Sequence, residues 1–253
     1  MLRCHRNPKT KETMKHLDFT IDFETCALTA NAAVMQVAIV PWLRDADVEP
    51  FLSKADAEPF VNYVDLRSCV VEGMDFDPKT IAWWSQQSDD AKHAVCQGLA
   101  EPIADVLVGA LDFIRRMVND YCLESICLWV HGMDVDAAIL RSLCRRFDID
   151  LETIIPHTQL RDCRTVILEA AHKMACQQHR EAIARAETLT SDGTPVPCPA
   201  VAPQEVLSGS RKAYDLFPPL PDRYAEGHEA HDALYDAMRS TWYTWQALKV
   251  MNN

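Results

Sequence analysis

The sequence lacks a long apolar run, and this absence argues against a protein with a membrane-spanning helix. No stretch of eighteen apolar residues occurs in the 253-residue chain, so no transmembrane helix is predicted. The first 15 residues are charged and lack the apolar segment of a secretory signal. We therefore expect a soluble cytoplasmic protein in which residues 1–15 are a flexible lead-in.

Positive charge is also scarce. Lys and Arg together number 25 against 37 Asp and Glu, which gives a formal net charge of −12 and a pI of about 5.1. This balance argues against a protein that binds nucleic acid through a broad basic surface. It leaves room for an enzyme in which cations held by a carboxylate cluster meet the phosphate instead.

A third absence concerns metal-binding cysteine pairs. The chain has 10 cysteines but no C-x-x-C pair, so a zinc site built from cysteines is not expected. Scattered thiols within apolar stretches are typical of a protein from a reducing compartment. Hydrophobic residues make up 48% of the chain, enough for a sizeable core.

Residue patterns predict strands first and helices later. Runs rich in β-branched and aromatic residues predict three antiparallel strands, at residues 16–23, 32–42 and 60–66. Asp77 as N-cap and Pro78 at the first helical position predict a short helix. A buried strand is predicted at 126–130, and apolar spacing predicts helices at 103–121, 134–147, 162–187 and 232–250. Residues 188–210, rich in Pro, Ser, Thr and Gly, are predicted to form a mobile loop.

The first candidate site lies in the first predicted strand, in the sequence I-D-F-E-T at 21–25. Because side chains alternate along a strand, Asp22 and Glu24 share one face while Ile21 and Phe23 point into a core. Two adjacent carboxylates in an apolar strand are unfavourable unless a cation neutralises them, and such oxygen ligands suit Mg²⁺ or Mn²⁺. The alternative for this motif alone is an edge strand with a solvated acidic face.

The second and third candidate sites contain an aspartate at a helix start. In H-G-M-D-V-D-A-A-I-L at 131–140, Asp134 and Asp136 open a helix, where either one is also an ordinary capping residue. In H-D-A-L-Y-D at 231–236, His231 and Asp236 would lie about 140° apart on a continuous helix. They can face one site only if His231 precedes the helix, with Asp232 as its N-cap. The sequence H-E-A-H at 228–231 lacks the H-E-x-x-H spacing of a zinc site.

These motifs, in this order, resemble the three exonuclease motifs of the DEDDh 3′–5′ exonuclease family. T-I-A-W-W-S-Q-Q-S at 80–88 and R-D-C-R-T at 161–165 resemble signatures of the branch that contains phage DexA, exonuclease VIII-like proteins and RNase T-like exoribonucleases. The similarity covers roughly residues 16–175 and 224–248. It implies an α/β, ribonuclease-H-like fold with a mixed five-stranded sheet flanked by helices. Residues 16–253 would form a single exonuclease domain with a loop insertion at about 188–210.

The resemblance also implies roles for individual residues. Metal binding is implied for four carboxylates: Asp22, Glu24 and Asp236, and Asp136 either directly or through water. Asp136 is preferred to Asp134 because Val135 and the pair Ile139–Leu140 match the apolar residues that the family places around this ligand. Two Mg²⁺ or Mn²⁺ ions would activate water and stabilise the leaving 3′-oxygen, and neutral His231 would act as general base. The product would be a nucleoside 5′-monophosphate.

Substrate-binding candidates lie near these motifs. Trp83 and Trp84 do not share a helical face, so one can be core while the other stacks on a base; both in the core is the alternative. Arg161 and Arg164, three residues apart, can present two cations to phosphate on one helical face, or pair with an acid such as Asp162. The set is completed by residues of the first two motifs, Thr25 and His131.

We expect the partner to be the 3′ end of a single-stranded nucleic acid, with DNA slightly favoured over RNA, and no membrane. An exoribonuclease with the same site is the alternative within this class. Alternatives from other classes are a catalytically silent nucleic-acid-binding subunit and a phosphate-metabolite hydrolase. The sequence leaves the oligomeric state open, with a homodimer as one option.

Overall fold

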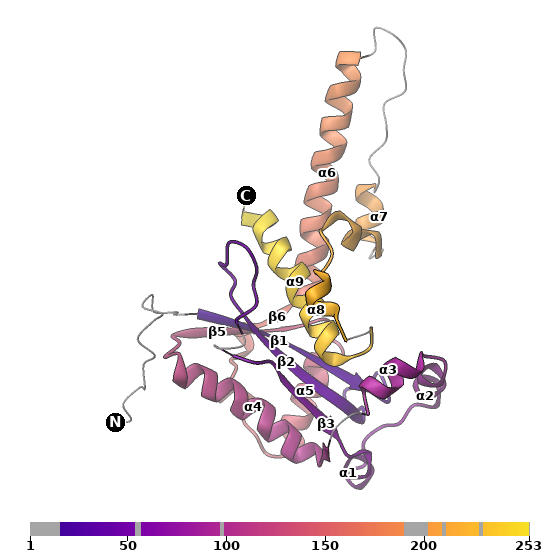
Figure 1. Cartoon of the computed structure of the whole chain (residues 1–253), viewed down its shortest axis with the longest axis vertical. Coiled ribbons are helices and arrows are strands. Elements are labelled where there is room, and N and C mark those ends of the chain that lie inside the picture. The colour runs from indigo at the N-terminus through magenta and orange to yellow at the C-terminus, as the bar shows by residue number, and fades with distance from the viewer. Residues whose placement is uncertain are drawn as a thin grey trace. The chain divides into compact units, whose positions relative to one another are not determined.

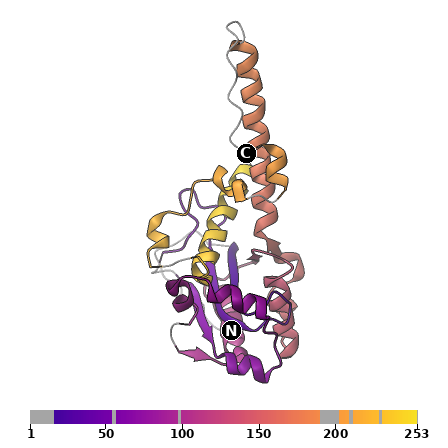
Figure 2. The same ribbon diagram turned by 90° about the vertical axis from the view of Figure 1, so that its right-hand side faces the viewer.

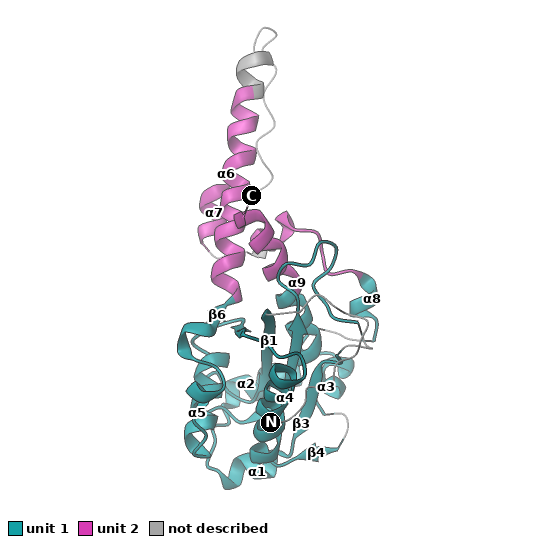
Figure 3. Ribbon diagram, turned by 90° about the vertical axis from the view of Figure 1, so that its left-hand side faces the viewer, with its two compact units in different colours: residues 1–162, 222–241 teal, residues 163–221, 242–253 magenta. Residues whose placement is uncertain are grey.

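The chain divides into two units, and the first comprises residues 1–162 and 222–241 (Figure 3). A mixed β-sheet with flanking helices makes up this unit. The computed structural model describes residues 16–53, 57–96, 99–189, 202–208, 211–227 and 230–252. Within these ranges the strands are β1 (His16–Thr25), β2 (Val34–Trp42), β3 (Phe60–Val64), β4 (Ala100–Glu101), β5 (Ser125–Val130) and β6 (Leu160–Asp162). Their order in the sheet is β4-β3-β2-β1-β5-β6; Figure 1 labels these strands apart from β4, which Figure 3 labels.

The antiparallel pairing predicted for the first three strands is confirmed. β1 pairs antiparallel with β2, and β2 with β3, whereas β5 runs parallel to β1 and β6 parallel to β5. The predicted α/β fold, with a mixed five-stranded sheet and flanking helices, is confirmed. The two-residue strand β4, parallel to β3, adds a sixth strand at one edge, and it is too short to leave a pattern in the sequence.

Alternation along β1 separates an apolar face of the sheet from a polar one. Ile21 and Phe23 belong to the main hydrophobic cluster, together with residues of the helices α4 (Ile103–Asp120) and α5 (Asp136–Arg146). Each large apolar side chain buried in this way contributes roughly 1.5–3 kcal/mol of stability. The opposite face of β1 carries polar side chains, and β1 lies between β2 and β5. The alternative of a solvated edge strand is therefore excluded.

The N-terminal part of helix α9 (Ala233–Asn252), residues 233–241, lies against this polar face in the first unit. The Thr241 hydroxyl donates to Thr20 Oγ1 on β1 at 2.8 Å, and Thr20 also accepts from Trp42 Nε1 at 3.0 Å. These bonds satisfy polar groups that would otherwise be buried without partners. They also attach α9 to β1 at Thr241, beyond the first turns of the helix.

Shorter helices complete the first unit. They are α1 (Leu66–Val71), α2 (Pro78–Ser85), α3 (Asp89–Ala94), α8 (Asp222–Ala225) and the 3₁₀ turns η1 (Leu151–Thr153) and η2 (His157–Gln159). The predicted start of α2 is confirmed, because the Asp77 side chain accepts from the Lys79 N–H at 3.0 Å and Pro78 is the first helical residue. Helix α5 begins at Asp136, two residues after the predicted start.

The second unit comprises residues 163–221 and 242–253 (Figure 3). It contains α6 (Cys163–Leu189), α7 (Pro203–Leu207), η3 (Arg211–Leu216) and the rest of α9. Helix α7 lies beside α6 in both views (Figures 1 and 2) and buries Val206. Within this unit, Trp242 Nε1 and Gln246 Nε2 both donate to the Pro218 carbonyl oxygen, at 2.9 and 3.0 Å.

Two predictions concern segments that lie partly or wholly outside the described residues. The lead-in, 1–15, lies outside them, as do 190–201 and 209–210 of the Pro-rich stretch. The described part of that stretch contains helix α7, which composition did not predict. None of the helices in the described ranges is both long enough and apolar enough to cross a membrane.

Candidate active site

The four predicted metal-binding carboxylates converge where β1 and β5 end. Ile21 pairs with Val130, the last residue of β5, so the chain after β5 passes beside Asp22. Helix α5 then begins at Asp136, which is 6% exposed. Asp236 comes from the first turn of α9. Parallel strands bring their carboxyl ends to one edge, which explains why residues so far apart in sequence meet here.

The short distances between these carboxylates affect their pKa values. Burial raises the pKa of Asp22 well above its ordinary value, and the neighbouring carboxylates Asp136, Glu24 and Asp236 raise it further. Burial, followed by Asp236 and Asp136, raises the pKa of Glu24 in the same way. Like charges at close range disfavour the ionised form of each group. A cation bound at the cluster would therefore favour the ionised forms of these carboxylates.

Asp236 accepts a hydrogen bond from a backbone N–H close to it in sequence. Burial raises its pKa, while the His231 backbone N–H, which donates to Oδ2 at 3.0 Å, opposes this rise. Ligand atoms of Glu24, His231 and Asp236 all lie within 4.8 Å of one another. The Glu24 and Asp236 carboxylates are oxygen ligands of the kind that Mg²⁺ or Mn²⁺ prefers, and the His231 ring lies beside them.

His231 lies outside helix α9, as the spacing argument requires. Its φ is +71°, a left-handed conformation, and α9 begins two residues later at Ala233. The Leu234 N–H donates to Asp232 Oδ1 at 3.1 Å, so Asp232 caps the helix as predicted. His228, at the start of the H-E-A-H sequence, lies outside the described residues.

The structure separates Asp136 from Asp134. The Asp136 carboxylate accepts from the His131 N–H at 3.2 Å and acts on the pKa values of Asp22 and Glu24. Asp134 is exposed in the turn before α5. The geometry thus brings Asp136 into the cluster.

Trp83 and Trp84, on α2, both contact the His231 ring, but only one faces solvent. Trp84 is 8% exposed, and its Nε1 donates to the Thr25 carbonyl oxygen at 2.9 Å. Trp83 is 40% exposed. The ring centroids of Trp83 and Trp84 lie 4.7 and 6.0 Å from that of His231, each edge-on. The alternative that both tryptophans are core residues is wrong, because Trp83 presents an open ring beside His231.

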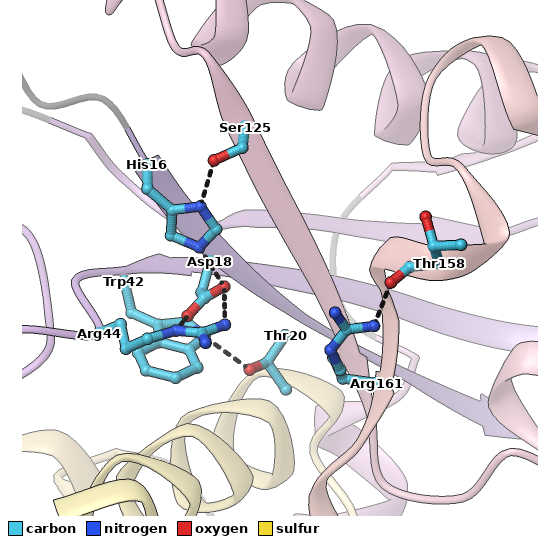
Figure 4. Close-up of polar contacts among 8 residues, drawn as sticks. All are labelled: His16, Asp18, Thr20, Trp42, Arg44, Ser125, Thr158 and Arg161. Carbon is cyan, nitrogen blue, oxygen red and sulfur yellow. Dashed lines mark hydrogen bonds and ion pairs between the residues drawn. The ribbon is translucent and has the colours of Figure 1, made fainter. Parts of the chain in front are cut away.

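The other substrate-binding candidates have hydrogen-bond partners within the protein, apart from Arg164, for which exposure alone is described. The buried Thr25 hydroxyl donates to the Ala27 carbonyl oxygen at 2.7 Å, and His131 Nδ1 lies 3.0 Å from Ser240 Oγ on α9. The prediction that Arg161 and Arg164 share one helical face is wrong. Arg161 lies on strand β6, where its guanidinium donates to the Thr158 carbonyl oxygen (Figure 4), whereas Arg164 is an exposed residue of α6.

A second charged cluster, which sequence reasoning missed, lies at the start of β1 (Figure 4). Asp18 is fully buried and accepts from Arg44 Nε at 2.8 Å and Nη2 at 3.0 Å. His16 Nε2 lies 2.9 Å from the same carboxylate. Ligand atoms of His16, Asp18 and Cys127 lie within 4.8 Å of one another, a spacing that metal ligands also have. Because Arg44 already engages both oxygens of Asp18, this cluster is an ion pair in which the carboxylate is buried and the guanidinium reaches solvent. A sequence signal for this residue exists, because Asp18 lies an even number of positions before Asp22 on β1 and therefore on the same polar face.

A mixed sheet of this topology, with a carboxylate cluster at the ends of its central strands, defines a ribonuclease-H-like nuclease domain. The family comparison is more specific. Residues 17–191 match the model of the Rv2179c-like 3′–5′ exoribonuclease domain, so the chain belongs to this family and carries a 3′–5′ exonuclease domain.

Among solved structures, the chain is similar to E. coli exonuclease I in complex with a dA16 oligonucleotide, with 15% sequence identity and a TM-score of 0.44. That match covers 89% of this chain and 39% of the other. A zinc-bound E. coli exonuclease I complex with single-stranded DNA gives 13% identity and a TM-score of 0.45, covering 94% and 40%. The chain thus spans about two fifths of the length of these solved chains. No curated protein sequence matches it.

Proposed function

We propose that this chain is a divalent-cation-dependent exonuclease that releases nucleoside 5′-monophosphates from the 3′ end of single-stranded nucleic acid. The observation that carries the proposal is the meeting of a crowded carboxylate cluster with a histidine in one partly buried site. The members are Asp22, Glu24, Asp136, Asp236 and His231. Membership of a 3′–5′ exoribonuclease domain family supports the direction of cleavage.

The donor set fits the proposed cofactor, two Mg²⁺ or Mn²⁺ ions. Such cations prefer carboxylate oxygens, and the four carboxylates would hold them. Burial raises the pKa values of Asp22, Glu24 and Asp236, and neighbouring carboxylates add to the rise, so a bound cation would favour their ionised forms. When bound, the cations lower the pKa of water and neutralise charge on the phosphate undergoing attack.

His231 is proposed as the general base. Its imidazole is only partly buried and can accept a proton from the attacking water and pass it to solvent. The left-handed backbone at His231 keeps the ring out of the helix, and the bond from its N–H to Asp236 fixes the backbone beside the cluster. The edge-on rings of Trp83 and Trp84 limit how far the imidazole can turn.

Trp83 is proposed to stack on a base near the 3′ end. Its ring is open to solvent and contacts the proposed base catalyst, so a nucleotide stacked there would lie at the reacting phosphate. Stacking of this kind contributes roughly 1–3 kcal/mol per base and tolerates any base. Trp84, held by its bond to Thr25, supports Trp83 from within, at a ring-centroid distance of 5.1 Å.

RNA is the first substrate to test, because the family is described by an exoribonuclease domain. The slight preference for DNA suggested by the branch resemblance stays a prediction. So do the assignment to that branch, the single exonuclease domain, a cytoplasmic location and a homodimer.

A panel of 5′-labelled RNA and DNA strands of one sequence, single-stranded and duplex, tests the proposal. With Mg²⁺ or Mn²⁺ we expect a ladder shortened from the 3′ end and nucleoside 5′-monophosphates as product, and with EDTA no shortening. Asp22→Asn is the inactive control. Strand binding without shortening would favour the silent subunit. Hydrolysis of free nucleotides alone would favour the metabolite hydrolase.

A further inference from the structure

Gln36 is a buried polar residue of β2 that belongs neither to the carboxylate cluster nor to the hydrophobic core. It is 0% exposed and pairs directly with Glu24 on β1 and with Tyr63 on β3. Directly paired residues of antiparallel strands point to the same face of a sheet. The Gln36 side chain therefore lies on the face that carries Glu24 and that receives the start of α9.

Both ends of the Gln36 amide are bonded to the first residues of α9. Its Nε2 donates to Asp232 Oδ1 at 3.0 Å, and its Oε1 accepts from the Ala233 N–H at 2.9 Å. The first N–H groups of a helix have no partner within the helix, so the amide and Asp232 together satisfy those of Ala233 and Leu234. A carboxylate or an apolar side chain at position 36 could not make both bonds.

The segment that Gln36 holds contains two residues of the proposed active site. Asp232 lies between His231 and the helix, and its carbonyl oxygen accepts from the Asp236 N–H at 2.9 Å. The Asp236 carboxylate in turn accepts from the His231 N–H at 3.0 Å. These bonds form one short network, so a shift of Asp232 displaces His231 and Asp236 together.

We propose that Gln36 is a positioning residue that sets His231 and Asp236 at their working distance from Glu24. This inference rests on the proposed function of the same site. Gln36 links the strand that faces Glu24 to the helix start that carries the other two groups. A misplacement of about 1 Å is enough to reduce a rate by roughly 10²-fold, so loss of the amide should lower kcat by that order.

Three variants separate positioning from general stability. Gln36→Met keeps the length of the side chain and removes both hydrogen bonds. Gln36→Glu keeps an acceptor for the Ala233 N–H but places a second carboxylate against Asp232. Thr20→Val is the matched control, because Thr20 is also 0% exposed, makes two side-chain hydrogen bonds and reaches α9, at Thr241 (Figure 4 shows its bond to Trp42).

The measurements are kcat and KM on the strand that wild type shortens, the melting temperature, and amide hydrogen exchange of residues 231–236. We expect a comparable fall in melting temperature for Gln36→Met and Thr20→Val. Only Gln36→Met should lose kcat, by roughly 10²-fold with KM within a few-fold, and only there should exchange of the Ala233 amide accelerate. Gln36→Glu should lose kcat as well.

Full kcat in Gln36→Met, or an equal loss in Thr20→Val, would overturn the positioning role. Amide exchange needs no substrate, so it separates this inference from the proposed function. If wild type shortens no strand, the proposed function fails, while faster exchange in Gln36→Met still supports the link to α9. Unchanged exchange in an active protein would overturn the inference alone.

Discussion

Replacing Glu24 by Gln tests how the charge of the site affects stability as well as activity. Glu24 is 9% exposed, and its pKa is raised by burial and then by Asp236, Asp136 and Asp232. Gln has nearly the same shape without the charge. Without divalent cations we expect Glu24→Gln to be more stable than wild type, although it should be inactive by several orders of magnitude.

The gain follows from the spacing of the carboxylates. Ligand atoms of Glu24 and Asp236 lie within 4.8 Å of each other. Two unit charges at that separation repel by roughly 3.5 kcal/mol at an effective dielectric constant of about 20. Partial protonation reduces this repulsion, so we expect a gain of about 1–3 kcal/mol. For a chain of this size each kcal/mol raises the melting temperature by roughly 2–4 °C.

The sign of the pH dependence is fixed by the raised pKa values. The folded chain holds protons that the unfolded chain releases, so the stability of the cation-free protein falls as pH rises. This loss begins above the ordinary carboxyl values of 3.8 and 4.5 and continues through the raised pKa values of Asp22, Glu24 and Asp236. The advantage of Glu24→Gln should therefore grow towards alkaline pH.

Thermal unfolding in EDTA and then in Mg²⁺ measures both effects. A saturating cation should reverse the order of stability, since binding at about a thousand times Kd stabilises wild type by about 4.1 kcal/mol. Asp134→Asn, which removes an exposed carboxylate, is the control. It should change neither the stability in EDTA nor the gain in stability from Mg²⁺. A Glu24→Gln protein that is less stable than wild type in EDTA at alkaline pH, or that gains as much stability from Mg²⁺, would contradict this prediction.

Three further predictions concern other parts of the first unit. Asp136→Asn should reduce turnover far more than Asp134→Asn; the opposite ranking would show that the motif register is wrong by two residues. Trp83→Ala should raise KM by roughly 5- to 100-fold with kcat nearly unchanged, as expected for a lost stacking platform, and Trp83→Phe should restore most of the affinity. Asp18→Ala should lower the free energy of unfolding by about 2–3 kcal/mol in denaturant titrations, less than for a fully buried pair because Arg44 reaches solvent. An Asp18→Ala protein as stable as wild type would show that the ion pair contributes nothing.

Local patterns predicted the central strands of the fold and the orientation of several side chains of the candidate site. Period-two alternation placed Asp22 and Glu24 on one face with Ile21 and Phe23 opposite, and the geometry of an α-helix placed His231 before α9. These predictions depend on residues close in sequence, whose relation the backbone alone determines. Convergence of the motifs itself came from the family resemblance.

The features that the sequence did not predict depend on very short elements or distant contacts. Strand β6 has only three residues, so Arg161 was assigned to a helix that begins two residues later. Gln36 and Asp232 are 196 residues apart, and no pattern near either one indicates their bond. Arg44, the partner of Asp18, lies just beyond the end of β2, where it looks like an ordinary surface cation.

The most direct test of the account is the rate at which wild type and His231→Asn shorten a 5′-labelled single-stranded RNA in Mg²⁺. Asn suits this position because it tolerates the left-handed backbone at His231 while removing the imidazole. We expect wild type to shorten the strand from its 3′ end and His231→Asn to do so roughly 10²–10⁴-fold more slowly, with Mg²⁺ binding retained in calorimetry. A variant as fast as wild type, or shortening from the 5′ end, would contradict the account.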